Sequence, residues 1–383
     1  MTKLTCLMPC LNERKTLKEC IDKAKESLKK LNVDGEVLIA DNGSTDGSIE
    51  IALQNGAKVI NVEEKGYGSA LITGIKNAKG EFVIMGDSDG TYPWDEIDAI
   101  YLELTKGFDL VMGNRFGGKI INGSMPFLSR FIGNPILSFL GRLFFKVKIN
   151  DFHCGLRGFN NKKMLELNLN SKGMEFASEI VIKSALNNLK ITEVNTKLFP
   201  GPVGRKPHLR PFRDGWRHLR LLLTFAPVWS GIFPGFIFIS SGLIIFSIIF
   251  LNNGVFFNLE LREHSLITSI GLILLGFNSL ISGCIGIFSL SNYSKYRNHN
   301  LVKILKKSRN LDRLIVVGFL TIFSGLFFII KSFNYWKNLD FANIEPASQI
   351  FQLSPGILLI LLGTQLIFSS FLFETIKNNL ITK

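Results

Sequence analysis

The chain has 383 residues, of which 46% are hydrophobic, and its formal net charge at pH 7 is +13. This composition is too apolar for an ordinary soluble enzyme and too charged for a chain that lies wholly in a membrane. The five cysteines form no Cys-x-x-Cys pair, so neither a disulfide framework nor a zinc site is indicated. Because the long uncharged runs all follow Trp229, we expect a soluble domain followed by a membrane domain.

Short apolar segments alternate with segments of helical periodicity in the first half of the chain. We expect strands at residues 4–8, 35–40, 57–62, 82–85 and 108–113. We expect helices at residues 14–31, from the turn at 43–47 to about 55, after the glycine-rich turn at 65–70, at 95–105 and at 173–189. This alternation predicts an α/β domain with a mainly parallel sheet and right-handed crossovers.

Polar side chains follow four of the predicted strands, at Asn12-Glu13, Asp41-Asn42, Asp87 to Asp89 and Asn114-Arg115. The carboxyl ends of parallel strands meet at one edge of an open sheet, where such sheets bind their ligands. Each cluster alone is also explained by turn chemistry. Their recurrence at the same structural position favours a nucleotide site. The Gly66-x-Gly68 turn lacks the third glycine of a dinucleotide fingerprint.

Asp87 and Asp89 stand one residue apart directly after the buried strand at 82–85. Two close carboxylates repel each other unless a cation lies between them. Mg²⁺ or Mn²⁺ that also bridges phosphate oxygens is the usual cation in such a site. The alternative is an Asp-rich turn whose side chains cap backbone amides.

The loop at residues 150–160 places Asp151, His153 and Arg157 among small and apolar residues. It predicts either a pocket that meets a second substrate or a loop with an internal Asp–Arg pair. Glu175 and Glu179 share one helix face, and they either orient Arg157 and line the site or form a solvated face.

A basic stretch with helical spacing of apolar residues leads into the uncharged half of the chain. Its apolar stripe includes Phe212 and Trp216 and is edged by arginines, which is typical of a helix in the membrane interface. We expect this amphipathic helix at residues 211–227. Nucleic acid as a partner is disfavoured, because the basic stretch runs directly into a membrane segment.

We expect four transmembrane helices, at about 231–251, 265–290, 314–332 and 353–374, within a membrane domain at 228–383. The loop at 291–313 is strongly basic, whereas the loops at 252–264 and 333–352 carry few basic residues. The positive-inside rule therefore places the basic loop, both termini and the domain at 1–210 on the cytoplasmic side. The start of the chain also lacks the pattern of a signal peptide.

The ordered set of motifs resembles a known family. The motifs are Met8-Pro9-Cys10-Leu11-Asn12-Glu13, Asp41 to Gly47, Gly86-Asp87-Ser88-Asp89-Gly90-Thr91-Tyr92-Pro93, Gly113-Asn114-Arg115-Phe116 and Asp151 to Phe159. Together, from about residue 5 to 220, they look like inverting glycosyltransferases of family 2, in the branch of polyprenyl (dolichyl) phosphate sugar synthases such as dolichol-phosphate mannosyltransferase. The resemblance implies a GT-A (nucleotide-diphospho-sugar transferase) fold.

The resemblance also implies roles for individual residues. Those that match the nucleotide site of the family are Pro9, Leu11, Glu13, Ile39 and Asp41. Those that match the diphosphate and metal site, with Mg²⁺ or Mn²⁺, are Asp87, Ser88, Asp89 and Thr91. Arg115 matches a donor contact, and the candidates for the acceptor phosphate are Arg205, Lys206 and Arg210. The segment at 201–207 departs from the dolichol-phosphate mannose pattern, so the phosphate ligand and the sugar stay open.

The sequence thus predicts metal-dependent transfer of a sugar from a UDP- or GDP-sugar to a polyprenyl (dolichyl or undecaprenyl) phosphate at the cytoplasmic membrane face. Asp89, Asp151 and Arg157 are the predicted catalytic residues, with Asp151 orienting or stabilising rather than acting as an indispensable base. A processive polysaccharide synthase usually carries Gln-x-x-Arg-Trp near the membrane, and Trp216-Arg217 does not match it. A non-catalytic membrane scaffold of the same fold is the other alternative. The sequence leaves the oligomeric state open.

Overall fold

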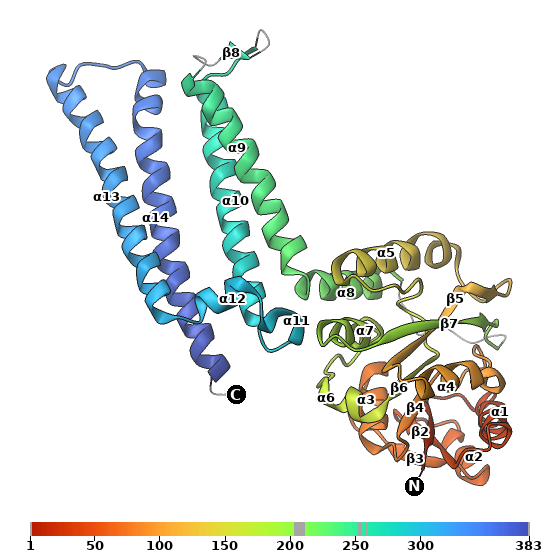
Figure 1. Cartoon of the computed structure of the whole chain (residues 1–383). Helices are drawn as coiled ribbons and strands as arrows, with labels where there is room; N and C mark the ends of the chain where they lie inside the picture. The colour runs from red at the N-terminus through yellow and green to blue at the C-terminus, as the bar shows by residue number, and fades with distance from the viewer. Residues whose placement is uncertain (1, 203–210, 252–254, 257–258, 382–383) are drawn as a thin grey trace. The chain divides into compact units, whose positions relative to one another are not determined.

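The computed structural model describes residues 2–202, 211–251, 255–256 and 259–381. The chain divides into two compact units, Met1–Leu222 and Leu223–Lys383 (Figure 1). The first unit is a β-sheet with helices on both faces, and the second consists mainly of long helices.

The elements of the first unit alternate as the apolar pattern predicts over its first half. In chain order they are β1 (Leu4–Cys10), α1 (Leu17–Lys30), β2 (Gly35–Asp41), α2 (Ser48–Gln54), β3 (Lys58–Asn61), α3 (Tyr67–Asn77), β4 (Phe82–Met85), η1 (Trp94–Glu96), α4 (Asp98–Thr105), β5 (Leu110–Ile120), η2 (Ser129–Gly133), α5 (Asn134–Phe145), β6 (Arg157–Asn160), α6 (Asn161–Glu166), α7 (Phe176–Leu186), β7 (Ile191–Leu198) and α8 (Pro211–Thr224).

The sheet of the described residues has seven strands in the order β3-β2-β1-β4-β6-β5-β7. Strand β6 runs antiparallel to β4 and β5, and the other neighbours pair in parallel. The mainly parallel sheet is confirmed, but the antiparallel β6 and the strand β7 were not anticipated. Strand β5 also continues past residue 113 to Ile120, because it pairs with β7 across an irregularity between Asn114 and Lys119.

Both faces of the sheet are buried, which explains why its strands are almost continuously apolar. On one face α1 and α4 pack against side chains such as Met8 and Ile84. On the other face α3 and α7 cover side chains such as Leu7. Leu71 and Ile75 of α3 point inward, as the helical spacing predicts. The helices therefore leave the carboxyl ends of the strands as the place for a ligand site.

The second unit contains four helices that are long and apolar enough to cross a bilayer. They are Val228–Leu251, Glu263–Ser289, Ser308–Asn338 and Ala347–Asn379, with mean hydropathies of 2.3, 2.0, 2.4 and 2.1. They confirm the prediction of four candidate spans. The elements of the unit are η3 (Val228–Ile232), α9 (Phe233–Leu251), β8 (Val255–Phe256), β9 (Leu259–Glu260), α10 (Glu263–Ser289), α11 (Ser294–Arg297), α12 (Asn300–Leu305), α13 (Ser308–Asn338) and α14 (Pro346–Ile381).

Small residues let the long helices approach closely in pairs. Between α13 and α14, a Cβ added to Gly318 would lie 2.8 Å from the carbonyl oxygen of Gly363. Between α9 and α10, a Cβ added to Gly235 would lie 2.9 Å from the carbonyl oxygen of Gly276. Close backbone packing of this kind is typical of helix pairs in membranes, where lipid supplies no hydrophobic driving force between helices.

Candidate functional site

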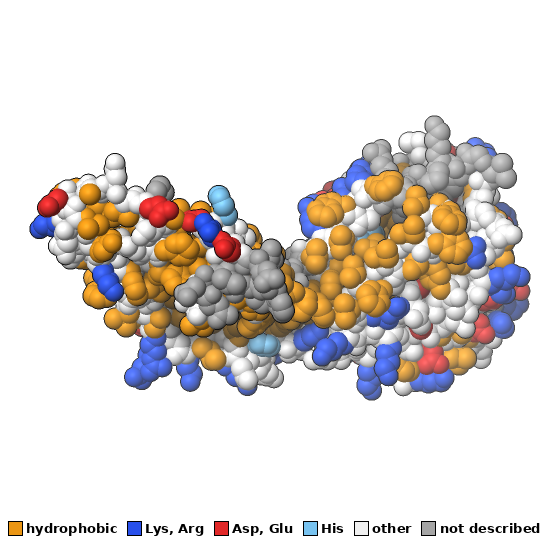
Figure 2. Space-filling model, turned by 90° about the horizontal axis from the view of Figure 1, so that it is seen from above, with side chains coloured by type: hydrophobic (Ala, Val, Ile, Leu, Met, Phe, Trp, Pro, Cys, Tyr) orange, Lys and Arg blue, Asp and Glu red, His pale blue; other side chains and the backbone are white. Residues whose placement is uncertain are grey.

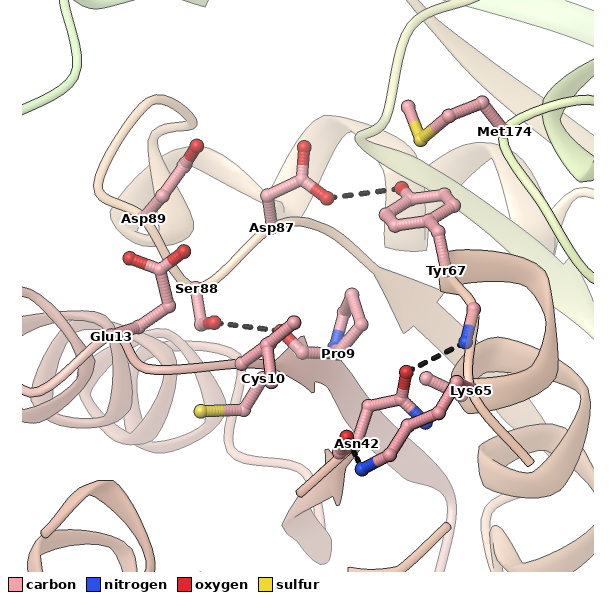
Figure 3. A pocket seen from close by; sticks show the side chains of 13 residues that line it. Pro9, Cys10, Glu13, Asn42, Lys65, Tyr67, Asp87, Ser88, Asp89 and Met174 are labelled. Carbon is pink, nitrogen blue, oxygen red and sulfur yellow. Dashed lines mark hydrogen bonds between the residues drawn. The ribbon is translucent and has the colours of Figure 1, made fainter. Parts of the chain in front are cut away.

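A cavity of about 570 Å³ opens at the carboxyl ends of β1, β2 and β4 (Figure 3). Parallel pairing of β1 with both neighbours brings the segments after these strands together, although they are far apart in the sequence. The residues that line the cavity are Pro9, Cys10, Leu11, Glu13, Asn42, Lys65, Gly66, Tyr67, Ala70, Asp87, Ser88, Asp89 and Met174. The predicted convergence of the first three polar clusters therefore takes place.

Local hydrogen bonds hold the two carboxylates at the end of β4. The Asp87 carboxylate accepts from the Tyr67 hydroxyl at 2.9 Å. The Asp89 carboxylate accepts from both the amide and the hydroxyl of Thr91, at 3.0 and 2.6 Å. The indole of Trp94 donates to the carbonyl of Asp87 at 3.0 Å and anchors the turn. Figure 3 shows the side chains of Asp87 and Asp89 extending from the same turn.

Tyr67 is a site residue that the sequence did not single out. Burial, followed by the negative charge of Asp87, raises the pKa of its phenol well above the ordinary value. The phenol therefore keeps its proton and acts as a donor to Asp87. The turn at Gly155 also approaches this carboxylate, because a Cβ there would lie 3.0 Å from Oδ2 of Asp87. The start of α3 and the loop before β6, which are distant in sequence, thus both lie against the carboxylate of Asp87.

The other end of the cavity is built on the turn after β2. Asn42 accepts from the amide of Gly66 through its side chain at 2.7 Å and from Nζ of Lys65 through its carbonyl at 2.6 Å. Asp41 accepts from two amides of its own turn through Oδ2, whereas its buried Oδ1 has no hydrogen-bond partner in the described structure. That oxygen is an acceptor available to a ligand N–H or hydroxyl. Ile39 is buried in the core of β2.

Arg115 lines a second cavity of about 360 Å³ rather than the first. The residues around this second cavity are Arg115, Phe116, Gly118, Ile120, Arg130, Phe131 and Pro135. Two guanidinium groups thus stand among apolar side chains. Arg130 also lies over the ring of Phe131, 5.3 Å from its centroid.

A buried bidentate ion pair joins Arg115 to Asp151. Nε and Nη2 of Arg115 donate to the two carboxylate oxygens at 2.6 and 2.8 Å, and the Arg115 amide adds a bond of 3.2 Å. Burial is the largest single influence and lowers the pKa of Arg115, but the charge and hydrogen bonds of Asp151 together with the neighbouring phenol of Tyr92 outweigh it and raise this pKa well above the ordinary value. Arg115 therefore keeps its positive charge. The Asp–Arg pair in this loop is formed with Arg115 and not with Arg157.

Arg157 occupies a different position from the one expected for a group that touches substrate. Its side chain is completely buried, and it donates to the carbonyls of Cys154 and Ala177. These bonds attach the loop before β6 to α7. We therefore correct its predicted role from a catalytic residue to a residue that braces the loop. Glu179 likewise binds the amides of Asn170 and Ser171 and does not orient Arg157.

His153, the third polar residue of this loop, belongs to a buried chain of hydrogen bonds that reaches α8. Its Nε2 is 3.1 Å from the hydroxyl of Ser178, which is 2.8 Å from Nδ1 of His218. Burial, followed by the neighbouring ring, lowers the pKa of His153 well below its usual value. Burial also lowers the pKa of His218 to about 4. Both rings are neutral near pH 7, and they dock α8 on α7.

Of the remaining predicted site residues, Ser88 and Thr91 are described by the structure and the three basic candidates for the acceptor phosphate are not. The hydroxyl of Ser88 donates to the carbonyl of Pro9 at 2.7 Å, so it braces the turn together with Thr91. Arg205, Lys206 and Arg210 lie outside the described residues. Met174 and Arg130 were missed, because each stands in a segment without a recognisable motif. Tyr67 stands in the glycine-rich turn, whose spacing in the sequence indicates only an incomplete dinucleotide fingerprint.

The carboxylates of the first cavity suit a hard divalent ion. Within the described ranges, no group of three His, Cys, Asp or Glu side chains is arranged to hold a metal. Mg²⁺ is commonly bound by one or two carboxylates, with substrate phosphates and water completing the coordination. Asp87 and Asp89 supply this number of protein ligands, so a metal that arrives with a diphosphate fits the site.

Two family models match the chain. The model "Glycosyl transferase family 2" matches residues 5–167, and "Glycosyltransferase family 2 C-terminal transmembrane region" matches residues 286–377. The first match covers β1 to α6, including Asp87, Asp89 and Asp151. The second covers the end of α10 and most of the last two long helices.

Curated relatives are similar over 50 to 61% of the chain. The low-salt glycan biosynthesis hexosyltransferase Agl6 of Haloferax volcanii is 37% identical over 234 residues, which are 61% of this chain and 56% of that protein. Glycosyltransferase AglJ of the same organism is 31% identical over 55% of this chain and 67% of its own length. A dolichol-phosphate mannosyltransferase of Pyrococcus furiosus is 30% identical over 50% of this chain and 55% of its own length.

The match to Agl6 thus spans little more than half of that relative, whereas the match to AglJ reaches two thirds of its length. The parallel sheet, the position of the carboxylates after β4 and the C-terminal helices agree with both family models. The chain belongs to glycosyltransferase family 2, with a GT-A domain followed by the C-terminal transmembrane region of that family.

Proposed function

We propose that this chain transfers a sugar from a UDP- or GDP-sugar to a polyprenyl phosphate, with inversion at the anomeric carbon. One observation carries the proposal: the carboxylates of Asp87 and Asp89 share a cavity with the turns after β1 and β2. This cavity has the polar groups that a nucleoside diphosphate requires. The names of the relatives Agl6 and dolichol-phosphate mannosyltransferase support a sugar as the transferred group.

In this proposal the base and ribose lie between the turn after β1 and the turn after β2. The unsatisfied Oδ1 of Asp41 accepts from a polar hydrogen of the nucleoside, and Glu13 lies on the path to the diphosphate. Asp87 and Asp89 hold Mg²⁺ or Mn²⁺. The metal, when bound, neutralises the charge that develops on the leaving diphosphate.

The acceptor phosphate binds in the second cavity in this proposal. Arg115 and Arg130 supply positive charge, and Phe116 and Phe131 supply apolar surface for the first isoprene units. A lipid phosphate is already an anion near pH 7, so it attacks the anomeric carbon without strong general-base help. Asp151 is then a positioning residue, because it orients the guanidinium of Arg115. Positioning alone is worth several kcal/mol in reactions of this type.

The membrane topology is part of the proposal. The basic stretch from the end of α10 into the first turns of α13 carries lysines and arginines at 295, 297, 303, 306, 307, 309 and 313. The positive-inside rule favours a cytoplasmic position for this stretch, and four spans then leave the catalytic unit on the same side.

The test is sugar transfer by purified full-length protein in detergent, with a panel of labelled UDP- and GDP-sugars, Mg²⁺ or Mn²⁺, and polyprenyl phosphate. We expect a labelled lipid that forms only when polyprenyl phosphate and metal are both present. The Asp89→Ala variant should lose this product, because a ligand of the metal is removed. Asp95→Ala removes an exposed carboxylate of the following segment and serves as the matched control.

Other results of the transfer assay would favour one of the alternative functions. Normal transfer by the Asp89→Ala variant would contradict the metal assignment. A polymer or free sugar in place of a labelled lipid would favour a processive synthase. Metal-dependent nucleotide binding without turnover of any donor would favour a non-catalytic scaffold. The anomeric configuration of the lipid product, read by NMR, tests inversion.

A further inference from the structure

A buried ion pair joins two residues of α7, Glu179 and Lys183. Nζ of the lysine is 2.7 Å from Oε1 of the glutamate, and the two side chains are 5 and 1% exposed. Figure 2 shows other Lys and Arg side chains on the surface of the first unit, where water solvates their charge. Lysine and glutamate are almost never buried to this extent unless they are paired. Among the described residues, neither member of this pair lines one of the two cavities.

Both members of the pair bind the backbone of one loop, at residues 168–174, which we name the cap loop. The carboxylate accepts from the amides of Asn170 and Ser171, at 3.1 and 2.8 Å. The ammonium donates to the carbonyl of Asn168 at 2.7 Å. Apolar side chains of similar size often replace a buried ion pair without loss of stability, but they could not make these bonds. The pair therefore holds the cap loop in its path.

The cap loop supplies the N-terminal cap of α3. The N-cap residue of α3 is Gly66, which has no side chain to bind the free amides of the first turn. The carbonyl of Lys172 accepts from the amides of Gly68 and Ser69 instead, at 2.9 and 3.2 Å. The approach is close, because a Cβ added to Gly66 would lie 2.2 Å from this carbonyl oxygen. A loop distant in sequence thus caps the helix.

The capped turn carries Tyr67, whose hydroxyl donates to Asp87 at 2.9 Å. Tyr67 stands between two glycines, so its own backbone restricts its position little. The glycine before it donates its amide to Asn42, and the glycine after it donates its amide to Lys172. Met174 of the cap loop lines the same cavity as Tyr67 (Figure 3). The cap loop therefore supports the part of the cavity wall that holds the phenol.

We propose that Glu179 and Lys183 are positioning residues for the metal–diphosphate site. They act through the cap loop and the first turn of α3, which keep the phenol of Tyr67 on the carboxylate of Asp87. This inference rests on the proposed function, because it takes Asp87 as a ligand of the metal. Groups that hold a metal ligand in place typically change metal affinity by about 10–100-fold when they are removed.

The test replaces the pair with apolar side chains of similar size, Glu179→Met with Lys183→Met, in the full chain in detergent. Binding of labelled UDP and GDP is measured as the Mn²⁺ concentration is raised, without acceptor lipid, so the readout does not need sugar transfer. We name the Mn²⁺ concentration at half-maximal binding the Mn²⁺ requirement, and we expect it to rise about tenfold. Hydrogen exchange at the amides of Gly68 and Ser69 should also become faster, because their acceptor is no longer held.

Two controls separate positioning from general damage. Glu36→Met with Lys58→Met makes the same exchange in another ion pair, whose carboxylate is 8% exposed at the amino end of β2. This control should leave the Mn²⁺ requirement at the parent value, whatever its effect on the melting temperature. In a Tyr67→Phe background, the exchange at 179 and 183 should raise the Mn²⁺ requirement no further, because the phenol through which the pair acts is already removed.

An unchanged Mn²⁺ requirement in the Glu179→Met, Lys183→Met variant would overturn the proposal. A further rise in the Tyr67→Phe background would contradict the route through the phenol, and unchanged hydrogen exchange at Gly68 and Ser69 would contradict the cap. Should the double variant fail to fold, Glu179→Gln keeps one acceptor for the loop amides, and it should raise the Mn²⁺ requirement by a smaller factor. No rise in that variant would also overturn the proposal.

The same measurements distinguish failure of this inference from failure of the proposed function. If the parent chain binds nucleotide without any dependence on Mn²⁺, or binds none, both the inference and the proposed metal site are wrong. If the parent shows Mn²⁺-dependent binding and the variants behave as expected, absence of sugar transfer would contradict only the proposed transfer.

Discussion

The buried ion pair between Arg115 and Asp151 allows a quantitative prediction. The Asp151 side chain is fully buried and that of Arg115 is 9% exposed. Asp151→Ala leaves a buried guanidinium without its counter-ion, which typically costs about 3–5 kcal/mol. In a unit of this size 1 kcal/mol shifts the melting temperature by about 2–4 °C, so we expect a decrease of about 6–20 °C.

The four cysteines of the first unit make this decrease measurable in the full chain. Cys6, Cys10, Cys20 and Cys154 are buried, so a thiol-reactive fluorogenic dye reports unfolding of this unit. A Cys284→Ala background removes the partly exposed thiol of the second unit. The thermal midpoint in detergent is then compared between parent and variant.

A double-mutant cycle separates loss of the pair from general damage. Arg115→Met combined with Asp151→Ala leaves no unpaired buried charge, so the double variant should be more stable than the sum of the single effects implies. The control is Glu96→Ala, which breaks an exposed pair with Lys197 and should change stability by less than about 1 kcal/mol. Strict additivity, or a decrease below about 2 °C for Asp151→Ala, would refute the reasoning.

Three further variants test other parts of the site. Tyr67→Phe removes the donor to Asp87, so the metal concentration for half-maximal transfer should rise without a matching loss of thermal stability. The folded pKa of His218 is about 4 and its ordinary value is 6.5, so the folded state binds fewer protons than the unfolded state. The contribution of neutral His218 to the free energy of unfolding is fully present above pH 6.5. About 3 kcal/mol of this free energy should be lost as the pH falls to about 4. His218→Gln should flatten this part of a melting profile followed by intrinsic fluorescence, and an unchanged slope would contradict the assignment. In Gly68→Ala the new Cβ would lie 2.0 Å from the carbonyl oxygen of Ser171, and a cost of about 1–3 kcal/mol should appear in the thiol assay. If Gly68→Ala were as stable as the parent, the segment around Ser171 would move away from the new Cβ at no cost in the free energy of unfolding.

The sequence by itself determined the elements whose signals are local. The strand at Phe82–Met85 was predicted with its observed bounds, because an apolar run between a turn and a polar cluster specifies a buried strand. The four candidate spans were also readable, since length and hydropathy are local properties. The order of strands and helices predicted a mainly parallel sheet, and its carboxyl edge brought Glu13, Asp87 and Asp89 to one cavity.

Only the tertiary structure decided which side chains meet across long stretches of chain. The antiparallel β6 enters between β4 and β5, and the loop before it turns Asp151 toward Arg115 and buries Arg157 against α7. Tyr67 reaches Asp87 because α3 packs over β1, the neighbour of β4 in the sheet, and no spacing in the sequence encodes this. The orientation of α5 is likewise a tertiary result. An amphipathic pattern indicates that one face of the helix is apolar, and the packing of Gly141 against Phe152 determines which side of α5 points inward.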